Sequence, residues 1–116
     1  MNRNLFHNWL RSFKKLDTTT SNARTSNCAR IEKYYDDLDQ LYNTDRCTNL
    51  IEQFGYSTTD KKLNREPLHK IPIDGDLYTG THTLEPAVKL YIEFRDNAII
   101  EELEYIGEHF INIPEG

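Results

Sequence analysis

Apolar side chains recur along most of the chain at steps of three and four residues, the period of one buried helix face. The first such row predicts a helix from about Asn4 to Lys15. A second row predicts a helix that begins near Ser21 or Asn22, after a run of hydroxyl-bearing residues typical of helix starts. Its apolar face consists of Cys28, Ile31, Tyr35, Leu38 and Tyr42.

A third helix is predicted from Thr44, which is its expected N-cap, to Phe54, with Gly55 as the stop. The stretch 57–60, Ser-Thr-Thr-Asp, is a further capping sequence. It predicts a short helix that reaches Arg65.

The stretch 66–80 contains two prolines and two glycines and cannot be regular helix. Ile71 and Ile73 precede an Asp-Gly turn signal, and Pro72 limits any strand here to a sheet edge. Two alternatives stay open, a small β-ribbon at 70–79 or an ordered loop that packs through its isoleucines.

Two helices are predicted in the last third. One begins near Thr81 or Thr83, which places Pro86 in its first turn, where proline is tolerated. The other runs from Asn97 to His109, with Ile99, Ile100, Leu103, Ile106 and Phe110 facing inward. Residues 110–116 are expected to form a tail.

Together these elements predict one all-α domain over residues 1–116, a compact bundle of five or six helices with one long ordered loop. Its length is near the commonest domain size, and apolar residues make up 37% of it, enough for a core. No apolar run is long enough to span a bilayer, so we expect no membrane association and a cytoplasmic setting. Both cysteines, Cys28 and Cys47, fall on apolar faces and predict buried, unreactive thiols.

The net charge of −5 is unevenly distributed. Residues 1–33 contain seven lysines and arginines against two acids, whereas residues 84–116 contain two against eight. Such asymmetry can orient a protein toward a polyanion or toward a basic partner. In the simpler interpretation, the two halves attract each other across a solvated surface.

No catalytic motif is present. The four histidines have no metal-ligand spacing, and the sequence has no glycine-rich phosphate loop and no nucleophile elbow. The acidic cluster at 36–39 lacks the glycine and the distal glutamate of a calcium loop. We therefore expect neither an enzyme nor a bound cofactor or metal.

The strongest constellation joins cations to hydroxyl and amide side chains around the predicted start of the second helix. Positive charge beside a helix N-terminus suits a phosphate backbone. The residues that predict contact with duplex DNA are Lys14, Lys15, Thr18, Thr20, Arg24, Thr25, Asn27 and Arg30. Arg24 and Asn27 are three apart and share a helix face that could reach base edges.

The segments FHNWL, TTTSNARTSNCARIEKYY, DRCTNLIEQF and TLEPAVKLYIEF, in this order, resemble the helical core-binding domain that precedes the catalytic domain in tyrosine recombinases of the phage-integrase type. The resemblance covers roughly Leu5 to Arg95 and rests on helix pattern. In that family the domain clamps duplex DNA, and a separate domain does the chemistry. It implies DNA contact from Thr18, Thr20, Arg24 and Asn27, without strand cleavage.

The alternative is a protein-interaction module or inhibitor of phage or mobile-element origin. In that hypothesis the acidic last helix occupies a basic surface on its target, and electrostatic complementarity selects the partner. The residues that would bind are Glu101, Glu102, Glu104 and Glu108.

Overall fold

The computed structural model describes the backbone of residues 1–112 and the side chains of residues 1–98. Over that range the chain forms six helices and no strand, which confirms the all-α prediction. The helices are α1 (Arg3–Ser12), α2 (Thr18–Tyr34), α3 (Leu38–Asp45), α4 (Thr48–Gln53), α5 (Thr58–Lys62) and α6 (Leu77–Asn112).

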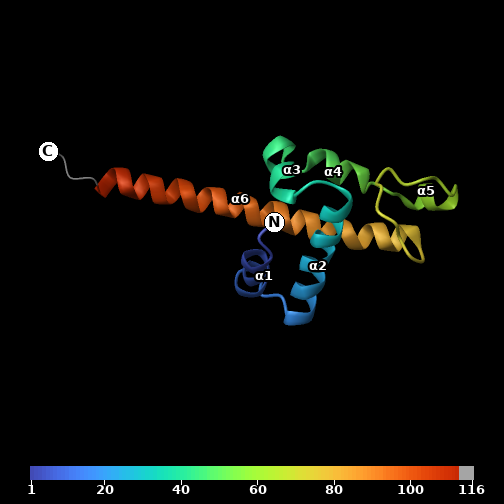
Figure 1. Cartoon of the computed structure of the whole chain (residues 1–116), viewed down its shortest axis with the longest axis horizontal. Coiled ribbons are helices and arrows are strands. Elements are labelled where there is room, and N and C mark those ends of the chain that lie inside the picture. The colour runs from blue at the N-terminus through green and yellow to red at the C-terminus, as the bar shows by residue number, and fades with distance from the viewer. Residues whose placement is uncertain (113–116) are drawn as a thin grey trace.

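Helix α6 runs through the middle of the domain, in contact with α1, α2, α4 and α5 (Figure 1). Its contact with α2 is the most extensive of these. The far end of α6 continues past α1 and α3 as a helix that stands away from the rest of the domain (Figure 1).

One hydrophobic core joins all the elements except α5. The buried apolar residues are Phe6, Leu10, Cys28, Ile31, Leu38, Cys47, Leu50, Phe54, Tyr56, Ile71, Leu84, Ala87, Val88 and Tyr91. Burial raises the pKa of Cys28, and it raises that of Cys47 to about 11. Both thiols are therefore buried and protonated at neutral pH, as the sequence predicts.

The starts of α1 and α5 follow local capping chemistry. The Asn2 side chain accepts from the backbone N–H of Leu5 at 3.1 Å and caps α1. Ser57 and Asp60 form a reciprocal capping box at α5, which confirms the predicted start there.

The predicted third helix is wrong as a single element. The chain forms α3 and α4, separated by Arg46 and Cys47, both of which have positive φ (58° and 60°). Thr44 lies inside α3 and caps nothing at its N-terminus; its hydroxyl donates to the carbonyl of Gln40. The break has a tertiary cause, because it turns Cys47 into the core while Arg46 reaches Asp96 on α6.

The stretch 63–76 is an ordered loop, and the β-ribbon alternative at 70–79 is wrong. Ile71 is buried and Ile73 is half-buried, as expected of packing anchors. The Asp76 carboxylate accepts hydrogen bonds from the backbone N–H and the hydroxyl of Thr79. These bonds cap α6, which begins at Leu77. The residues expected to form a second strand are therefore the first turn of a helix.

The two predicted final helices are one helix, so the boundary expected near Asn97 is wrong. The Asn97 amide donates to the carbonyl of Glu93 at 3.0 Å, within the helix, and no glycine or proline interrupts this point. Because α6 begins at Leu77, Pro86 lies in its interior and has no N–H to give to the preceding turn. Helix α6 also includes the first three residues of the expected tail, and residues 113–116 lie outside the described range.

Candidate functional site

Two of the cations predicted to contact DNA are bound within the chain. The Lys14 ammonium lies 2.9 and 3.1 Å from the carboxylate oxygens of Glu93 on α6. The Arg30 guanidinium donates to the carbonyl of Pro72 in the long loop. Both cations are therefore engaged in contacts within the domain.

The start of α2 is also occupied. Asp17 is its N-cap, and its carboxylate accepts from the backbone N–H of Thr20 at 2.7 Å. Hydrogen bonds from Thr20 lower the pKa of Asp17, so this helix end carries a negative charge at neutral pH. A phosphate approaching the same N–H groups would meet that carboxylate. The Thr25 hydroxyl donates to the carbonyl of Ser21 one turn earlier.

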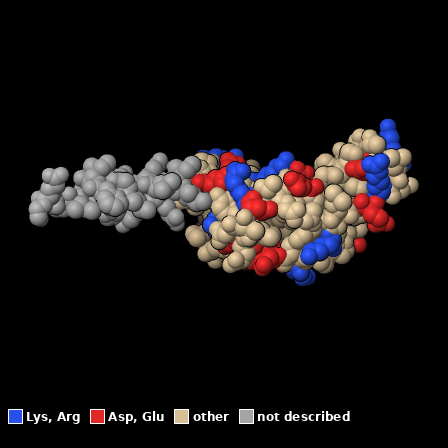
Figure 2. Space-filling view, turned by 90° about the horizontal axis from the view of Figure 1, so that it is seen from above, with Lys and Arg blue, Asp and Glu red and all other residues tan. Residues whose placement is uncertain are grey.

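The other predicted contacts stay on or near the surface. Lys15 and Thr18 are exposed, whereas Thr20, Arg24 and Asn27 are half-buried. Blue and red patches alternate over the face drawn in Figure 2, where no broad basic area is visible. Six of the eight predicted residues lie on α2, but the face drawn in Figure 2 shows no continuous basic surface; the six are Thr18, Thr20, Arg24, Thr25, Asn27 and Arg30.

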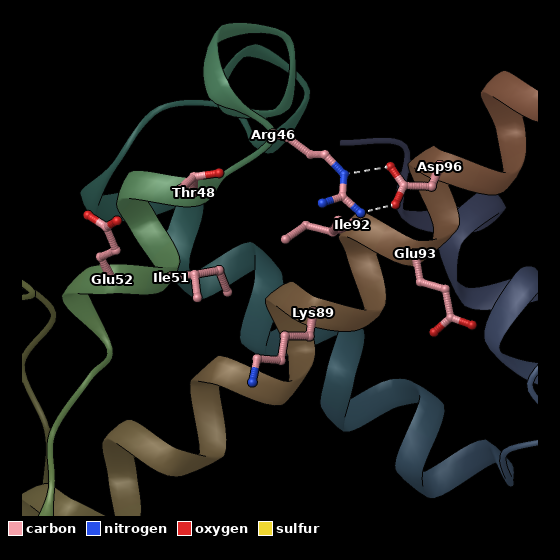
Figure 3. Close-up of a pocket in the computed structure, with 8 residues that line it drawn as sticks. All are labelled: Arg46, Thr48, Ile51, Glu52, Lys89, Ile92, Glu93 and Asp96. Atoms are coloured by element: carbon pink, nitrogen blue, oxygen red, sulfur yellow. Dashed lines mark hydrogen bonds and ion pairs between the residues drawn. The ribbon is translucent and has the colours of Figure 1, made fainter.

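A groove lies between α4 and α6 (Figure 3). Its volume is about 470 Å³, within the range of ligand pockets in proteins. It is lined by Arg46, Thr48, Ile51, Glu52, Lys89, Ile92, Glu93 and Asp96. Ile51 and Ile92 supply its apolar surface, and charged side chains surround them.

An ion pair closes one end of the groove. The Arg46 Nε donates to Asp96 Oδ1 at 3.0 Å and an Nη donates to Oδ2, as the dashed lines in Figure 3 show. The Tyr42 hydroxyl donates to the same Asp96 oxygen at 2.6 Å. The hydrogen bond with Arg46, more than that with Tyr42, lowers the pKa of Asp96. The wall is therefore ionised and fixed at neutral pH.

The remaining charges of the rim differ in their partners. Lys89 pairs with Glu85 at 2.8 Å, one turn earlier on α6, and Glu93 pairs with Lys14. Glu52 has no cation within ion-pair distance among the side chains described. Three carboxylates and two cations line the groove, which leaves it slightly acidic.

This groove was not predicted from the sequence. Ile51 stands in the predicted third helix at helical spacing from Cys47 and Phe54, which predicts a buried position, yet it is half-buried. Ile92 lies outside the apolar row of its helix, which consists of Leu84, Ala87, Val88 and Tyr91. An apolar residue beside that row was therefore the available sequence signal for the groove. The acidic residues of the alternative hypothesis, 101–108, lie outside the residues whose side chains are described.

No group of histidine, cysteine and carboxylate side chains suited to a metal ion occurs in the described part of the chain. Nor does a helix in this part have the length and hydropathy to cross a membrane. No family model, no curated protein and no solved structure matches the chain. The resemblance to the recombinase core-binding domain therefore stays a prediction.

Proposed function

We propose that this domain is a non-catalytic protein-interaction module whose α4–α6 groove binds a segment of a partner protein. The observation that carries the proposal is the composition of the groove, in which Ile51 and Ile92 are surrounded by charged side chains. An apolar centre with a polar, solvated rim is the usual anatomy of a protein–protein interface.

A protein segment fits the groove better than a small molecule does. Small-molecule sites fix their ligands with a few convergent polar groups in a mostly apolar cavity. Here the polar groups stand at the rim, where the side chains of Arg46 and Lys89 are each 62% exposed. Cations that are this exposed to solvent contribute complementarity more than tight fixation of a ligand.

The charge of the rim defines the partner's chemistry. Arg46, Lys89 and Glu93 already have partners of opposite charge within the chain, whereas Glu52 has none among the described residues. A complementary segment would place an apolar side chain over the isoleucines and a lysine or arginine beside Glu52. This agrees with a basic partner surface, although the binding residues differ from the glutamates expected from the sequence.

Selection from a random peptide library tests the proposal. Peptides selected on the wild-type protein should combine an apolar anchor with a basic residue, and Ile92→Glu should weaken their binding by at least about tenfold. Leu68→Glu is the matched control, because Leu68 is 73% exposed and lies outside the groove. Selected peptides that bind both variants equally would show that the groove is not the interface.

Contact with duplex DNA is the second proposal. Lys15 and Thr18 are exposed and Arg24 is half-buried, and neither Lys15 nor Arg24 has an ion-pair partner among the described residues. The engagement of Lys14 and Arg30 inside the domain, together with the net charge of −5, places this proposal second.

A further inference from the structure

A second groove, between α1 and α2, has an unusual lining for so acidic a chain. The two helices are in contact, and the groove beside them has a volume of about 360 Å³. It is lined by Arg3, Asn4, His7, Asn22, Thr25 and Ser26. The chain contains nineteen acidic residues, yet none of them lines this groove. Three other grooves of the described surface each include at least one carboxylate.

The lining offers hydrogen-bond donors that the domain itself does not use. The side chains of Arg3, Asn4, Asn22 and Ser26 have no hydrogen-bond or ion-pair partner among the side chains described. A guanidinium, two amides and a hydroxyl together can supply several donors to one anion. Thr25 differs from them, because its hydroxyl donates to Ser21 in its own helix.

One of the lining residues also has a buried ring nitrogen without a partner. His7 Nε2 is shielded from solvent and has no hydrogen-bond partner, a state that is rare for a buried polar atom. His7 lies on α1 one turn after Arg3 and lines the groove with it. Because Nε2 is shielded, a small rotation of the ring is needed to open it to a ligand oxygen in the groove, which would then supply the missing partner.

From the acid-free lining, the unused donors and the unpartnered His7 nitrogen, we infer that the α1–α2 groove binds a phosphoryl group. Arginine matches the geometry of phosphate oxygens through parallel hydrogen bonds, and hydroxyl and amide groups complete such sites. A carboxylate has two oxygens that can accept hydrogen bonds, whereas a phosphate monoester has three terminal oxygens. The phosphate therefore satisfies more of the donors in the groove. This inference does not depend on the protein-binding proposal, whose residues lie on α4 and α6.

Titration with inorganic phosphate, followed by backbone amide NMR, tests the inference. Saturable shifts are expected at Thr25 and Ser26, and Arg3→Gln should weaken binding by about tenfold. Arg11→Gln is the matched control, because Arg11 is an exposed arginine of the same helix that does not line the groove. His7→Ala should also weaken binding, whereas a purely structural role would leave the affinity of the folded variant unchanged.

Parallel titrations identify the source of the phosphoryl group. Tighter saturable binding of a mononucleotide than of inorganic phosphate would assign a small-molecule phosphate ester. Tighter binding of duplex DNA, lost in Arg3→Gln but kept in Arg11→Gln, would assign a backbone phosphate. The inference fails if none of the three ligands produces saturable shifts at the groove, or if the two arginine variants lose affinity equally.

Discussion

The ammonium of Lys14 and the carboxylate of Glu93 are ion-paired across 79 positions of sequence, with Nζ–Oε distances of 2.9 and 3.1 Å. The pair joins the end of α1 to α6. It also brings together the basic first third and the acidic last third of the chain. This contact is an instance of the simpler interpretation of the charge asymmetry, in which the two halves attract each other.

The Lys14–Glu93 pair supplies a test of the DNA proposal. Glu93→Gln should release the Lys14 ammonium, which would then be available to a phosphate. We expect DNA affinity at low salt to rise and the logarithmic salt dependence to steepen by about 0.9, the effect of one added phosphate contact. Glu85→Gln is the control, since it removes the same charge from the Lys89 pair. DNA affinity is measured by fluorescence anisotropy. An equal rise in the DNA affinity of both variants would indicate only an effect of net charge.

Asp39 links α3 to α6 at a position where loss of the carboxylate should be costly. Its Oδ1 accepts from the hydroxyl of Tyr91, which is 1% exposed, and from Arg95 at 2.6 Å. Asp39→Ala leaves the buried hydroxyl without this acceptor. We expect the free energy of unfolding to fall by about 1–3 kcal/mol, measured by urea denaturation. A variant as stable as the wild type would show that the Tyr91 hydroxyl finds another partner.

The same carboxylate should make stability depend on pH in the acid range. Burial alone would raise the pKa of Asp39, but hydrogen bonds from Tyr91 and Arg95 outweigh it and lower the pKa below the ordinary 3.8. The folded state therefore binds this proton less readily than the unfolded state. The stabilisation is present above the unfolded pKa and is lost as pH falls through the folded value. Asp39→Asn should show a shallower acid transition than the wild type.

His69 should make stability depend on pH nearer neutrality. Its Nδ1 accepts from the backbone N–H of Ile71, so Nε2 carries the proton and donates to the Thr81 hydroxyl at 2.8 Å. Burial lowers the pKa of His69 from 6.5, which means that the unfolded chain takes up a proton first. The melting temperature should therefore fall as pH decreases through 6.5. His69→Gln should flatten this dependence while lowering stability at neutral pH.

Gly80 should resist replacement by alanine, although alanine is the better helix former. A Cβ at this position would lie 2.3 Å from Cγ2 of Ile73 in the long loop. We expect Gly80→Ala to lower the free energy of unfolding by about 1–3 kcal/mol through overpacking. In an Ile73→Ala background the same change should become stabilising, by up to about 1 kcal/mol, because only the helix propensity remains. An unchanged sign in the double-mutant cycle would contradict this account.

Helical periodicity predicted the core well where the pattern depends on local spacing. Leu84, Ala87, Val88 and Tyr91 form the buried stripe of α6, as the steps of three and four residues indicate. The packing of the long loop through its isoleucines and the capping sequence at the start of α5 were also predicted correctly. These features follow from the chain's own neighbours in sequence, so they can be read without knowing what packs against them.

The break between α3 and α4, which the sequence did not indicate, depends on a contact between distant residues. Arg46 adopts a positive φ while binding Asp96, fifty positions later, and this break separates α3 from α4. The α4–α6 groove exists only because the two helices come together in this orientation. The predicted DNA-binding set was divided for the same reason, since no local pattern shows that Lys14 meets Glu93.

The unbroken course of α6 determines where this protein can tolerate insertions and deletions. Adding one residue between Ala87 and Ile92 would rotate everything beyond it by about 100° about the helix axis. Ile92 and Asp96 would leave the groove, and the partners of Lys14 and Arg46 would point elsewhere. The exposed tip of the long loop, by contrast, can change in length without moving any of them. Length variation among natural variants should therefore concentrate between α5 and α6 and be absent from the middle of α6.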